Sequence, residues 1–519
     1  MTAPHTYITT TIPYVNARPH IGFALELVQA DVLARHYRRT ASAVRFQTGT
    51  DDNALKNVLA AKAAGVAVQD FVDRNAAAFT ALAGTLSLSV DDTIRTSRDP
   101  RHRIGVHRLW QACAASGDLY RKHYEGLYCV GCEQFYTSAE LTDDGRCREH
   151  GTRPELIEEE NWFFRLSRYA GPLRRAVESG ALRIEPVQRR NEVLAFIDGG
   201  LADFSVSRDA LRARGWGIPV PGDPSQVIYV WWDALGNYLT ALNYGDPDDS
   251  DLERWWTTAA RRIHLIGKGV IRFHAVYWPA ILLSAGEARP TDILVHDYLT
   301  TGGRKISKSG GADADPHALV ARYGTDAVRW WLLREVPRSG DTDFTPERLV
   351  SRANDELANG IGNLVKRVVT TIHRYRDGYA PPAFPDSPDA DSPHTDSPHA
   401  GALAAAIREA DAEISGALAA YAFRPATEAV WRIAVEANRY IEHAKPWELA
   451  RAERGGAASH DLDAVLGELL GACRAIGERL GPFLPDAAAR ITRQCEAEPD
   501  GRLPAAVSAL PRIERLDLA

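Results

Sequence analysis

The chain begins with alternating short apolar segments and one long amphipathic segment. Residues 7–12 are rich in Ile and Thr, as in a buried strand. In HIGFALELVQADVLARHYRR, residues 20–39, apolar positions recur at helical spacing, and basic residues stand at its end, as the helix dipole favours. AVRFQTGTDD, residues 43–52, predicts a second strand entering a polar loop. This order predicts the start of a parallel α/β sheet.

The pattern changes twice further along the chain. From about Tyr120 a segment rich in Cys, Tyr and Gly predicts a small insertion with its own core. Sheet-like runs resume at residues 226–235 (QVIYVWWDAL), 262–271 and 291–299. After about Asp343 the sequence predicts mostly helices. DSPDADSPHTDSPHA, residues 386–400, interrupts them, and its low apolar content predicts a flexible linker or surface loop.

Length and composition set the broad class of protein. A chain of 519 residues exceeds one hydrophobic core, so we expect two to four domains. No apolar run reaches membrane-spanning length, and the N-terminus lacks the pattern of a signal peptide. Six cysteines do not suggest a disulfide framework, so we expect a cytoplasmic protein without membrane contact. A net charge of −7 argues against indiscriminate nucleic-acid binding but allows a local basic face.

Four residues of the insertion have the spacing of a metal site. Cys129-x-x-Cys132 is followed, after fourteen residues, by Cys147-x-x-His150. Three thiolates and one imidazole suit tetrahedral Zn²⁺, and all four positions are filled by protein. The spacing therefore predicts a structural zinc ion that stabilises a small insertion.

Two segments suit a nucleotide. His20 stands where a turn meets a predicted helix N-terminus, where free N–H groups and the helix dipole favour an anion. TTGGRKISKSGG places Lys305 and Lys308 in a glycine-flanked loop, with Ser307 between them. These side chains can surround a triphosphate. Each motif alone is weak, and their occurrence together with the cysteine knuckles is more specific.

These motifs resemble those of class I aminoacyl-tRNA synthetases, and within them the methionyl-tRNA synthetases. PHIGF is similar to the HIGH-type signature and KISKS to the KMSKS signature. Six further segments are similar to that family in the same order: GTDDNALK, YCVGCEQFY, NEVLAFI, YVWWDALGNY, HLIGKGVIRFHAVYWP and NRYIEHAKPWEL. The resemblance implies an α/β chain with a doubly wound, Rossmann-type catalytic domain, a zinc-binding insertion and an all-α anticodon-binding bundle.

The resemblance also implies boundaries. The catalytic domain would occupy residues 1–117 and 225–299, and the connective insertion residues 118–224. A stem-contact segment with the lysine loop would occupy 300–350. The helical bundle would occupy 351–519, with a low-complexity linker at 381–400.

Roles follow from the resemblance residue by residue. Asp51 would bind the ammonium group of the substrate. ATP with Mg²⁺ would be bound by Pro19, His20, Gly22, Phe23, Lys305, Ser307 and Lys308, among which His20, Lys305 and Lys308 would be catalytic. The methionine pocket would be lined by Ile12, Tyr14, Trp231, Ala234, Leu235, Tyr238, Val270 and His274. The tRNA anticodon would be read by Asn363, Arg367 and Trp447.

The chain departs from the family at the active centre. The second histidine of the HIGH-type motif, which donates to the α-phosphate, is replaced by Phe23, and a helical position three residues after His20 predicts a side chain directed toward the nucleotide. The usual Asp-Glu-His-Gly after Gly49-Thr50 reads Asp51-Asp52-Asn53-Ala54. The Asp after Ile-Gly-Lys is Gly269.

Three hypotheses about function follow. The first is a methionyl-tRNA synthetase that activates methionine, or a close analogue, with ATP and charges tRNA. The second is a paralogue that passes the adenylated amino acid to a non-tRNA amine or hydroxyl. The third is a non-catalytic protein that binds methionine or tRNA. The preserved anticodon positions favour the first, and the altered phosphate site favours the second. The sequence contains no dimerising extension after the bundle, so we expect a monomer.

Overall fold

The computed structural model describes residues 4–40, 42–129, 134–136, 138–148, 151–306, 314–381, 397–456 and 460–514. It divides into two compact units. Unit 1 comprises Met1–Gly84, Leu88–Tyr298 and Ile306–Gly311. Unit 2 comprises Thr85–Ser87, Leu299–Lys305 and Ala312–Ala519.

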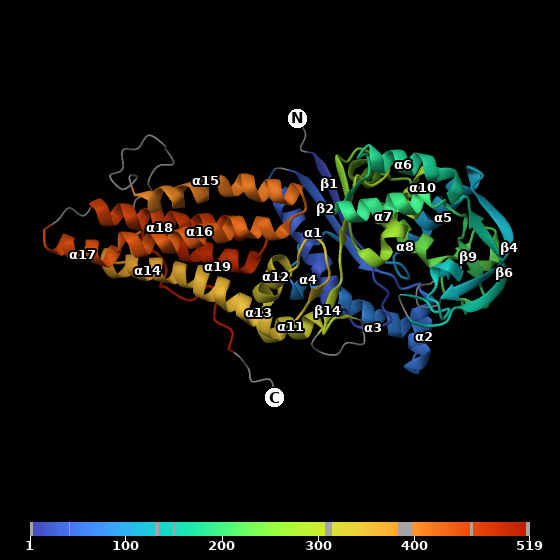
Figure 1. Ribbon diagram of the computed structural model, residues 1–519, viewed down its shortest axis with the longest axis horizontal. Coiled ribbons are helices and arrows are strands. Elements are labelled where there is room, and N and C mark those ends of the chain that lie inside the picture. Colours follow the sequence, from blue (N-terminus) through green and yellow to red (C-terminus); the bar gives the residue numbers. More distant parts are fainter. Residues whose placement is uncertain are drawn as a thin grey trace. The chain divides into compact units, whose positions relative to one another are not determined.

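Unit 1 is built on a six-stranded sheet of order β3-β2-β1-β12-β13-β7 (Figure 1). All neighbouring strands in it are parallel. The order runs outward from β1 in one direction and from β12 in the other, which confirms a doubly wound fold and puts its switch point between these strands. The strands are β1 (His5–Thr10), β2 (Ala43–Thr50), β3 (Asp92–Arg95), β7 (Arg183–Glu185), β12 (Arg261–Gly267) and β13 (Asp292–His296).

Helix α1 (Ile21–Arg39) packs against β1, β2 and β12. One apolar cluster joins the sheet to helices α5, α8 and α10, with Tyr7, Trp232 and Trp278 fully buried in it. The helices of unit 1 are α1, α2 (Leu55–Ala63), α3 (Val68–Thr80), α5 (Pro100–Ala115), α6 (Ala170–Glu178), α7 (Val187–Asp198), α8 (Val230–Thr240), α9 (Ser250–Leu252) and α10 (Trp278–Ala285), and the short α4 (Leu82–Thr85) lies where the two units divide.

The prediction of one sheet-like run over residues 226–235 is wrong in its second half. Strand β11 (Asp223–Ile228) ends before it, and α8 begins at Val230. Nearly every residue of α8 is buried, polar Asp233, Asn237 and Thr240 included, and its first residues continue the apolar run of β11, so the pattern does not show where the strand ends. The runs at 262–271 and 291–299 form β12 and β13 as predicted.

The predicted insertion has two antiparallel sheets of its own. One has the order β5-β4-β6-β8 and the other β10-β11-β9. Strand β7, which also lies between residues 118 and 224, joins the main parallel sheet instead. The bounds are β4 (Leu119–Cys129), β5 (Gln134–Tyr136), β6 (Glu155–Phe164), β8 (Phe204–Ser205), β9 (Ser207–Asp209) and β10 (Pro219–Val220).

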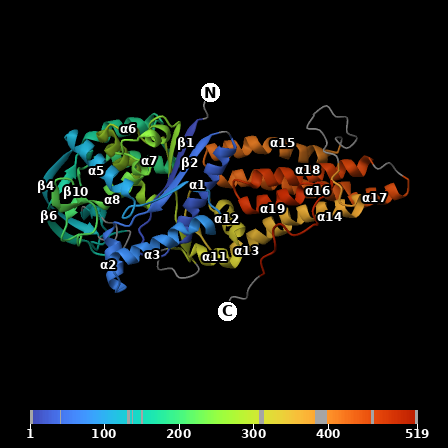
Figure 2. The same ribbon diagram turned by 180° about the vertical axis from the view of Figure 1, so that it is seen from behind.

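Unit 2 is mainly helical, as predicted, and Figures 1 and 2 both show its long helices side by side. Residues 382–396 of the predicted linker lie outside the described residues, and Pro398 already begins α15. The helices are α11 (Pro316–Tyr323), α12 (Thr325–Arg334), α13 (Pro346–Arg352), α14 (Asn363–Arg376), α15 (Pro398–Ala419), α16 (Phe423–Ala444), α17 (Pro446–Arg454), α18 (His460–Leu480) and α19 (Pro485–Cys495). A small sheet contains β14 (Leu299–Thr301), β15 (Arg304–Lys305) and β16 (Thr342–Asp343).

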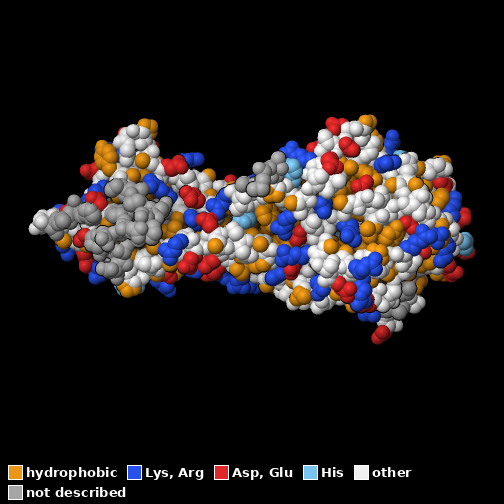
Figure 3. Space-filling view, turned by 90° about the horizontal axis from the view of Figure 1, so that it is seen from above, with side chains coloured by type: hydrophobic (Ala, Val, Ile, Leu, Met, Phe, Trp, Pro, Cys, Tyr) orange, Lys and Arg blue, Asp and Glu red, His pale blue; other side chains and the backbone are white. Residues whose placement is uncertain are grey.

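The surface carries both signs of charge. On the face shown in Figure 3, Lys and Arg side chains are interspersed with Asp and Glu. Among the described residues, no helix is long and apolar enough to cross a bilayer.

Candidate active site

The turn between β1 and α1 forms a capped helix N-terminus beside the switch point of the sheet. His20 is the N-cap residue, and its Nδ1 accepts the Gly22 N–H at 3.1 Å. In the neutral ring Nε2 therefore carries the proton and is a donor. A side chain at Gly22 would meet the imidazole at 3.0 Å, so the cap requires glycine there. The cap uses the Gly22 N–H, and the Phe23 and Ala24 N–H groups bond to the His20 carbonyl at 2.9 and 3.3 Å. The turn therefore favours an anion through the helix dipole and the His20 Nε2–H.

Phe23 packs into the protein at the first turn of α1. Its side chain is 8% exposed, and its ring meets Phe79 of α3 edge-to-face at 5.6 Å. Leu27, Gly49 and Thr50 line the same small hollow. The ring therefore has an apolar partner in this chain, and its contact with a nucleotide stays a prediction.

The two carboxylates after β2 have different surroundings. Asp52 is fully buried and accepts from Arg95 Nη2 at 2.7 Å, Ser97 Oγ at 2.7 Å and Thr50 Oγ1 at 2.9 Å. These hydrogen bonds engage the Asp52 carboxylate in holding the loop that follows β2. Asp51 is 1% exposed and accepts the backbone N–H of Asn53 at 3.1 Å. The binding of a substrate ammonium group by Asp51 stays a prediction.

Asn53 is held by a buried polar chain that the sequence did not reveal. Its Nδ2 donates to Asp233 Oδ2 at 2.7 Å. The other oxygen of Asp233 pairs with His102 Nε2, and His102 Nδ1 meets Thr240 Oγ1 at 2.8 Å. Asp233 is 1% exposed and His102 fully buried. The acidic residue within the otherwise apolar WWDAL was the available signal.

The predicted methionine pocket is uncharged around its histidine. His274, in a π-helical turn at Phe273–Tyr277, has Nδ1 at 3.0 Å from the Val270 carbonyl oxygen and Nε2 at 2.8 Å from Tyr238 Oη. A carbonyl only accepts, so Nδ1 carries the proton and Nε2 accepts from the Tyr238 hydroxyl. Burial lowers the pKa of His274 to about 4. The imidazole is therefore neutral at physiological pH.

Aromatic rings form the rest of this pocket. Trp231 is half-buried and stacks on Phe273 at 3.8 Å, and Tyr14 lies 6.2 Å from it. Within the described part of the chain, Trp231 Nε1 is buried without a hydrogen-bond partner. Ile12, Ala234, Leu235 and Tyr238 are all buried. Helix α8 contacts the π-helical turn, and the roles of these residues toward methionine stay predictions.

A second histidine beneath the pocket was missed from the sequence. His264 of β12 is fully buried, stacks on Tyr238 at 4.2 Å and has Nδ1 at 2.6 Å from Thr9 Oγ1. Trp278 Nε1 donates to its Nε2 at 3.2 Å. Burial lowers the pKa of His264 well below its ordinary value, so a neutral ring supports Tyr238 from below.

A charged pair links α1 to the end of β13. Glu26 is 2% exposed and accepts from the backbone and hydroxyl of Thr11, each at 2.6 Å. His296 Nε2 meets its other oxygen at 3.0 Å. Burial opposes protonation, but the hydrogen bond and charge of Glu26 raise the pKa of His296. The pair places a carboxylate and an imidazole at the carboxyl edge of the sheet.

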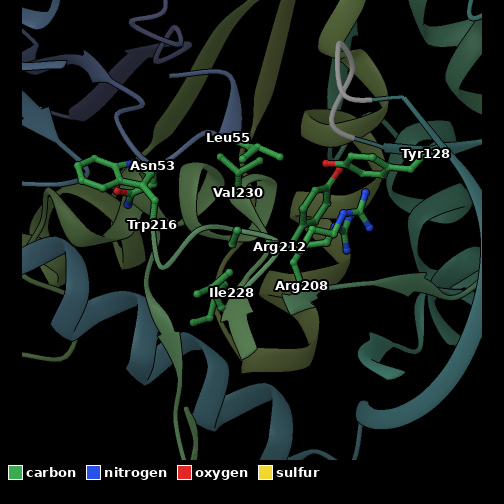
Figure 4. A pocket seen from close by; sticks show the side chains of 11 residues that line it. Asn53, Leu55, Tyr128, Arg208, Arg212, Trp216, Ile228 and Val230 are labelled. Carbon is green, nitrogen blue, oxygen red and sulfur yellow. The ribbon is translucent and has the colours of Figure 1, made fainter. Parts of the chain in front are cut away.

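A small open pocket lies beside Asn53 (Figure 4). Trp216 and Asn53 line one side of it, and Arg208 and Tyr128 lie on the other. The Arg208 guanidinium lies 5.3 Å from the Tyr128 ring centroid. The lining is thus aromatic and basic, and no motif in the sequence indicated it.

The lysine loop is only partly described. Lys305 ends β15, and Ser307 and Lys308 lie outside the described residues. The role of these three residues toward a triphosphate stays a prediction.

Two of the four predicted zinc ligands are described. Cys129 and Cys147 are each 1% exposed, and Cys132 and His150 lie outside the described residues. Thr152 touches both halves of the motif: its Oγ1 lies 3.8 Å from Cys129 Sγ, and its carbonyl accepts the Cys147 N–H at 2.8 Å. Among the described residues alone, no group of three His, Cys, Asp or Glu could hold a metal.

The predicted anticodon residues lie together within unit 2. Asn363 begins α14, and Arg367 follows one turn later. The Arg367 guanidinium lies 5.5 Å from the ring centroid of Trp447 and pairs with Glu442 at 2.7 Å. Trp447 is 38% exposed, so one part of an aromatic ring faces solvent beside a cation.

A doubly wound sheet, a capped helix after its first strand and a following helical unit are the parts of a class I aminoacyl-tRNA synthetase. The family described as tRNA synthetases class I (M) matches residues 6–147 and 138–369. The methionine–tRNA ligase of Brucella melitensis is 40% identical over 99% of this chain and 96% of that protein. The Mycobacterium tuberculosis ligase is 38% identical over 96% and 94%. The chain therefore belongs to the class I (M) family of tRNA synthetases.

Solved structures agree with this assignment. Mycobacterium tuberculosis methionyl-tRNA synthetase in complex with methionyl-adenylate has a TM-score of 0.89 and 36% identity, covering 98% of this chain and 100% of that one. The free form of the same enzyme has a TM-score of 0.83 and 34% identity, covering 99% of both.

Proposed function

We propose that this chain activates methionine with ATP as methionyl-adenylate and transfers the methionyl group to tRNA. The observation that carries the proposal is the neutral aromatic pocket around His274, Tyr238 and Trp231. Aromatic faces suit a polarizable thioether, and a neutral imidazole avoids a buried charge beside it. Similarity along almost the whole chain to proteins named methionine–tRNA ligase supports the same reaction.

The described residues divide the work of adenylation. Asp51 binds the methionine ammonium group, which leaves the carboxylate toward the nucleotide. The His20 Nε2–H donates to the α-phosphate, where negative charge grows as the carboxylate attacks, and the positive end of the α1 dipole favours that charge. Lys305 and Lys308 hold the leaving pyrophosphate. ATP brings Mg²⁺ as its counter-ion, so we assign no protein ligand to that ion.

The cysteine motif would hold a structural zinc ion. Two buried thiols that share Thr152 as a neighbour fit such a site, and Cys132 and His150 would complete it. Bound zinc supplies folding energy to the insertion. The Cys147 N–H bond to Thr152 holds the second half of the motif, and the contact of Thr152 Oγ1 with Cys129 Sγ links it to the first half.

Three residues of unit 2 support tRNA as the acceptor of the methionyl group. A partly exposed Trp447 beside Arg367, with Asn363 one turn away on α14, offers a stacking surface and base-edge donors for single-stranded RNA. The expectations of a monomeric, cytoplasmic protein stay predictions.

ATP–pyrophosphate exchange with single amino acids tests activation. We expect exchange with methionine to exceed exchange with leucine or isoleucine, by a modest factor, because one methylene is worth about 1–3 kcal/mol in a pocket. Charging of tRNA is then measured with the preferred amino acid. Exchange without charging would move the proposal to a different acceptor, and exchange with a polar amino acid alone would overturn the methionine assignment.

A further inference from the structure

Two neighbouring loops at the carboxyl edge of the sheet meet at Gly269 and Tyr298. Gly267 and His296 are register partners at the ends of β12 and β13. Lys268-Gly269 and Asp297-Tyr298 therefore leave adjacent parallel strands at the same edge, where doubly wound sheets bind ligands. Gly269 is the position at which the family resemblance leads one to expect an aspartate.

The Tyr298 hydroxyl occupies the space in which a side chain at position 269 would begin. A Cβ added to Gly269 would overlap Tyr298 Oη and lie 3.4 Å from its Cζ. A polar oxygen thus stands at this spot, but it comes from the segment after β13 rather than from the segment after β12. Because Gly269 has no side chain, the Tyr298 phenol can fill this space.

Charged neighbours hold this ring. Lys268 Nζ lies 4.5 Å from the Tyr298 ring centroid and 3.9 Å from Asp297 Oδ1. Asp297 is 6% exposed and also pairs with Arg189. A cation against the ring face and a buried carboxylate behind it favour one ring position.

The residues that flank this contact reach two parts of the site. His296, two residues before Tyr298, meets Glu26 of α1 at 3.0 Å. Val270, next to Gly269, accepts from the pocket residue His274. The two segments that meet at Gly269 and Tyr298 thus lead to the predicted methionine pocket and to the helix at which the nucleotide is expected.

We propose that Tyr298 is a nucleotide-contacting residue, whose hydroxyl donates to an oxygen of ATP in place of the missing carboxylate. The proposal rests on the function proposed above. A phenol differs from a carboxylate in the property that matters near polyphosphate: it donates a hydrogen bond and adds no negative charge. Gly269 is required because any side chain there displaces the hydroxyl.

The test is a set of variants at the two positions, measured by methionine-dependent ATP–pyrophosphate exchange and by calorimetric binding of ATP and of methionine separately. We expect Tyr298→Phe to lower kcat/KM for ATP about tenfold, the cost of one hydrogen bond to a charged group, and to leave methionine affinity unchanged. Gly269→Ala should give a similar loss. The double variant should lose no more than either single one, because both changes remove the same contact.

The variants that restore the carboxylate at position 269 give the most decisive test. Gly269→Asp alone should impair ATP binding, since it meets the Tyr298 hydroxyl. Gly269→Asp combined with Tyr298→Phe has room for the new side chain and should exceed Tyr298→Phe alone in kcat/KM. Tyr379→Phe, at a tyrosine that is 49% exposed, is the matched control and should change nothing.

Unchanged kcat/KM and ATP affinity in Tyr298→Phe would overturn the proposal, whether or not its melting temperature falls. Additive losses in Tyr298→Phe/Gly269→Ala would do the same. If the wild-type protein shows no methionine-dependent exchange, the function proposed above fails instead. The calorimetric ATP affinities then still decide whether Tyr298 contacts the nucleotide.

Discussion

Three of the departures from the family pattern at the active centre, Phe23, Asn53 and Gly269, have specific partners in this chain. The Phe23 ring meets Phe79, the Asn53 amide bonds Asp233, and Gly269 leaves room for the Tyr298 hydroxyl. Random loss of function would leave such positions without matched neighbours. The three contacts therefore favour a centre that has been adjusted as a unit.

This argument predicts the outcome of Phe23→His. An imidazole at position 23 would lie in an apolar hollow against the edge of Phe79. We therefore expect the adenylation rate to stay the same or to fall. Single-turnover adenylation measures the rate. Phe23→Leu serves as the control for lost ring packing without a new polar group.

The triple variant Phe23→His, Asn53→His and Gly269→Asp completes this test. Residues that act together are not additive, so the triple variant should differ from the sum of its single changes. A gain near the 10²-fold that one preorganised donor supplies, from Phe23→His alone, would show instead that the site is merely weakened.

The buried state of His274 predicts how pH affects the pocket. Its pKa is lowered to about 4, so the imidazole stays neutral as pH falls from 8 to 5. Methionine affinity by calorimetry should then stay flat over this range and fall only as pH approaches 4. An affinity that fell with a midpoint near 6.5 would show that the ring titrates as an exposed histidine does.

The lowered pKa of His274 also predicts how the stability of the fold depends on pH. Between about pH 6.5 and pH 4 the unfolded chain binds a proton at His274 that the folded chain does not. The free energy of unfolding of unit 1 should therefore fall as pH falls through this window, by up to about 3 kcal/mol from this residue. His264 acts in the same direction, and His296, whose pKa is raised, acts in the opposite one. His274→Asn should show the weaker pH dependence in urea unfolding.

At the scale of elements, the proposed zinc site predicts how the insertion is stabilised. Cys147→Ser should lower bound zinc below one ion per chain and loosen β4, β5 and β6, because metal binding there is coupled to folding. Elemental analysis and the melting temperature report these two effects. Cys113→Ser is the matched control: Cys113 is also fully buried, but in α5, so it should cost stability without changing metal content. Wild-type protein without zinc would contradict the assignment.

The elements show what the sequence could predict and what it could not. The strand, turn and helix from His5 to Arg39 were predictable because their apolar periods differ and His20 stands at the cap. Helix α8 was not, because its first residues continue the apolar run of β11. Strand β7 has three residues and joins the main sheet through long-range pairing with β13, which no local pattern records.

The candidate site residues could likewise be predicted only where a local sequence motif contains them. Residues within motifs, such as His20, Asp51 and His274, were reached by resemblance. Asp233 and His102 were missed because their importance lies in a contact between distant segments. Tyr298 was missed for the same reason, since only the geometry shows whose side chain fills the space at Gly269.

At the scale of the whole molecule, the two units divide most of the proposed reaction; Lys305, which is assigned to the activation step but belongs to unit 2, is the exception. His20, Asp51, His274 and the other described pocket residues all belong to unit 1. Asn363, Arg367 and Trp447 all belong to unit 2. A change confined to the exposed surface of unit 2 should then affect the tRNA step and leave amino-acid activation intact.

Trp447→Ala tests this division. Loss of a stacking surface worth about 1–3 kcal/mol should lower kcat/KM for tRNA by about ten- to a hundredfold, while ATP–pyrophosphate exchange with methionine stays at the wild-type rate. Tyr379→Ala removes another exposed aromatic ring of unit 2 that no anticodon role is assigned to, and it should leave both steps unchanged. Equal loss of exchange and charging in Trp447→Ala would indicate general damage to folding. Undiminished charging would show that the tRNA is recognised elsewhere, because a base that stacks on Trp447 cannot lose that surface without a cost in affinity.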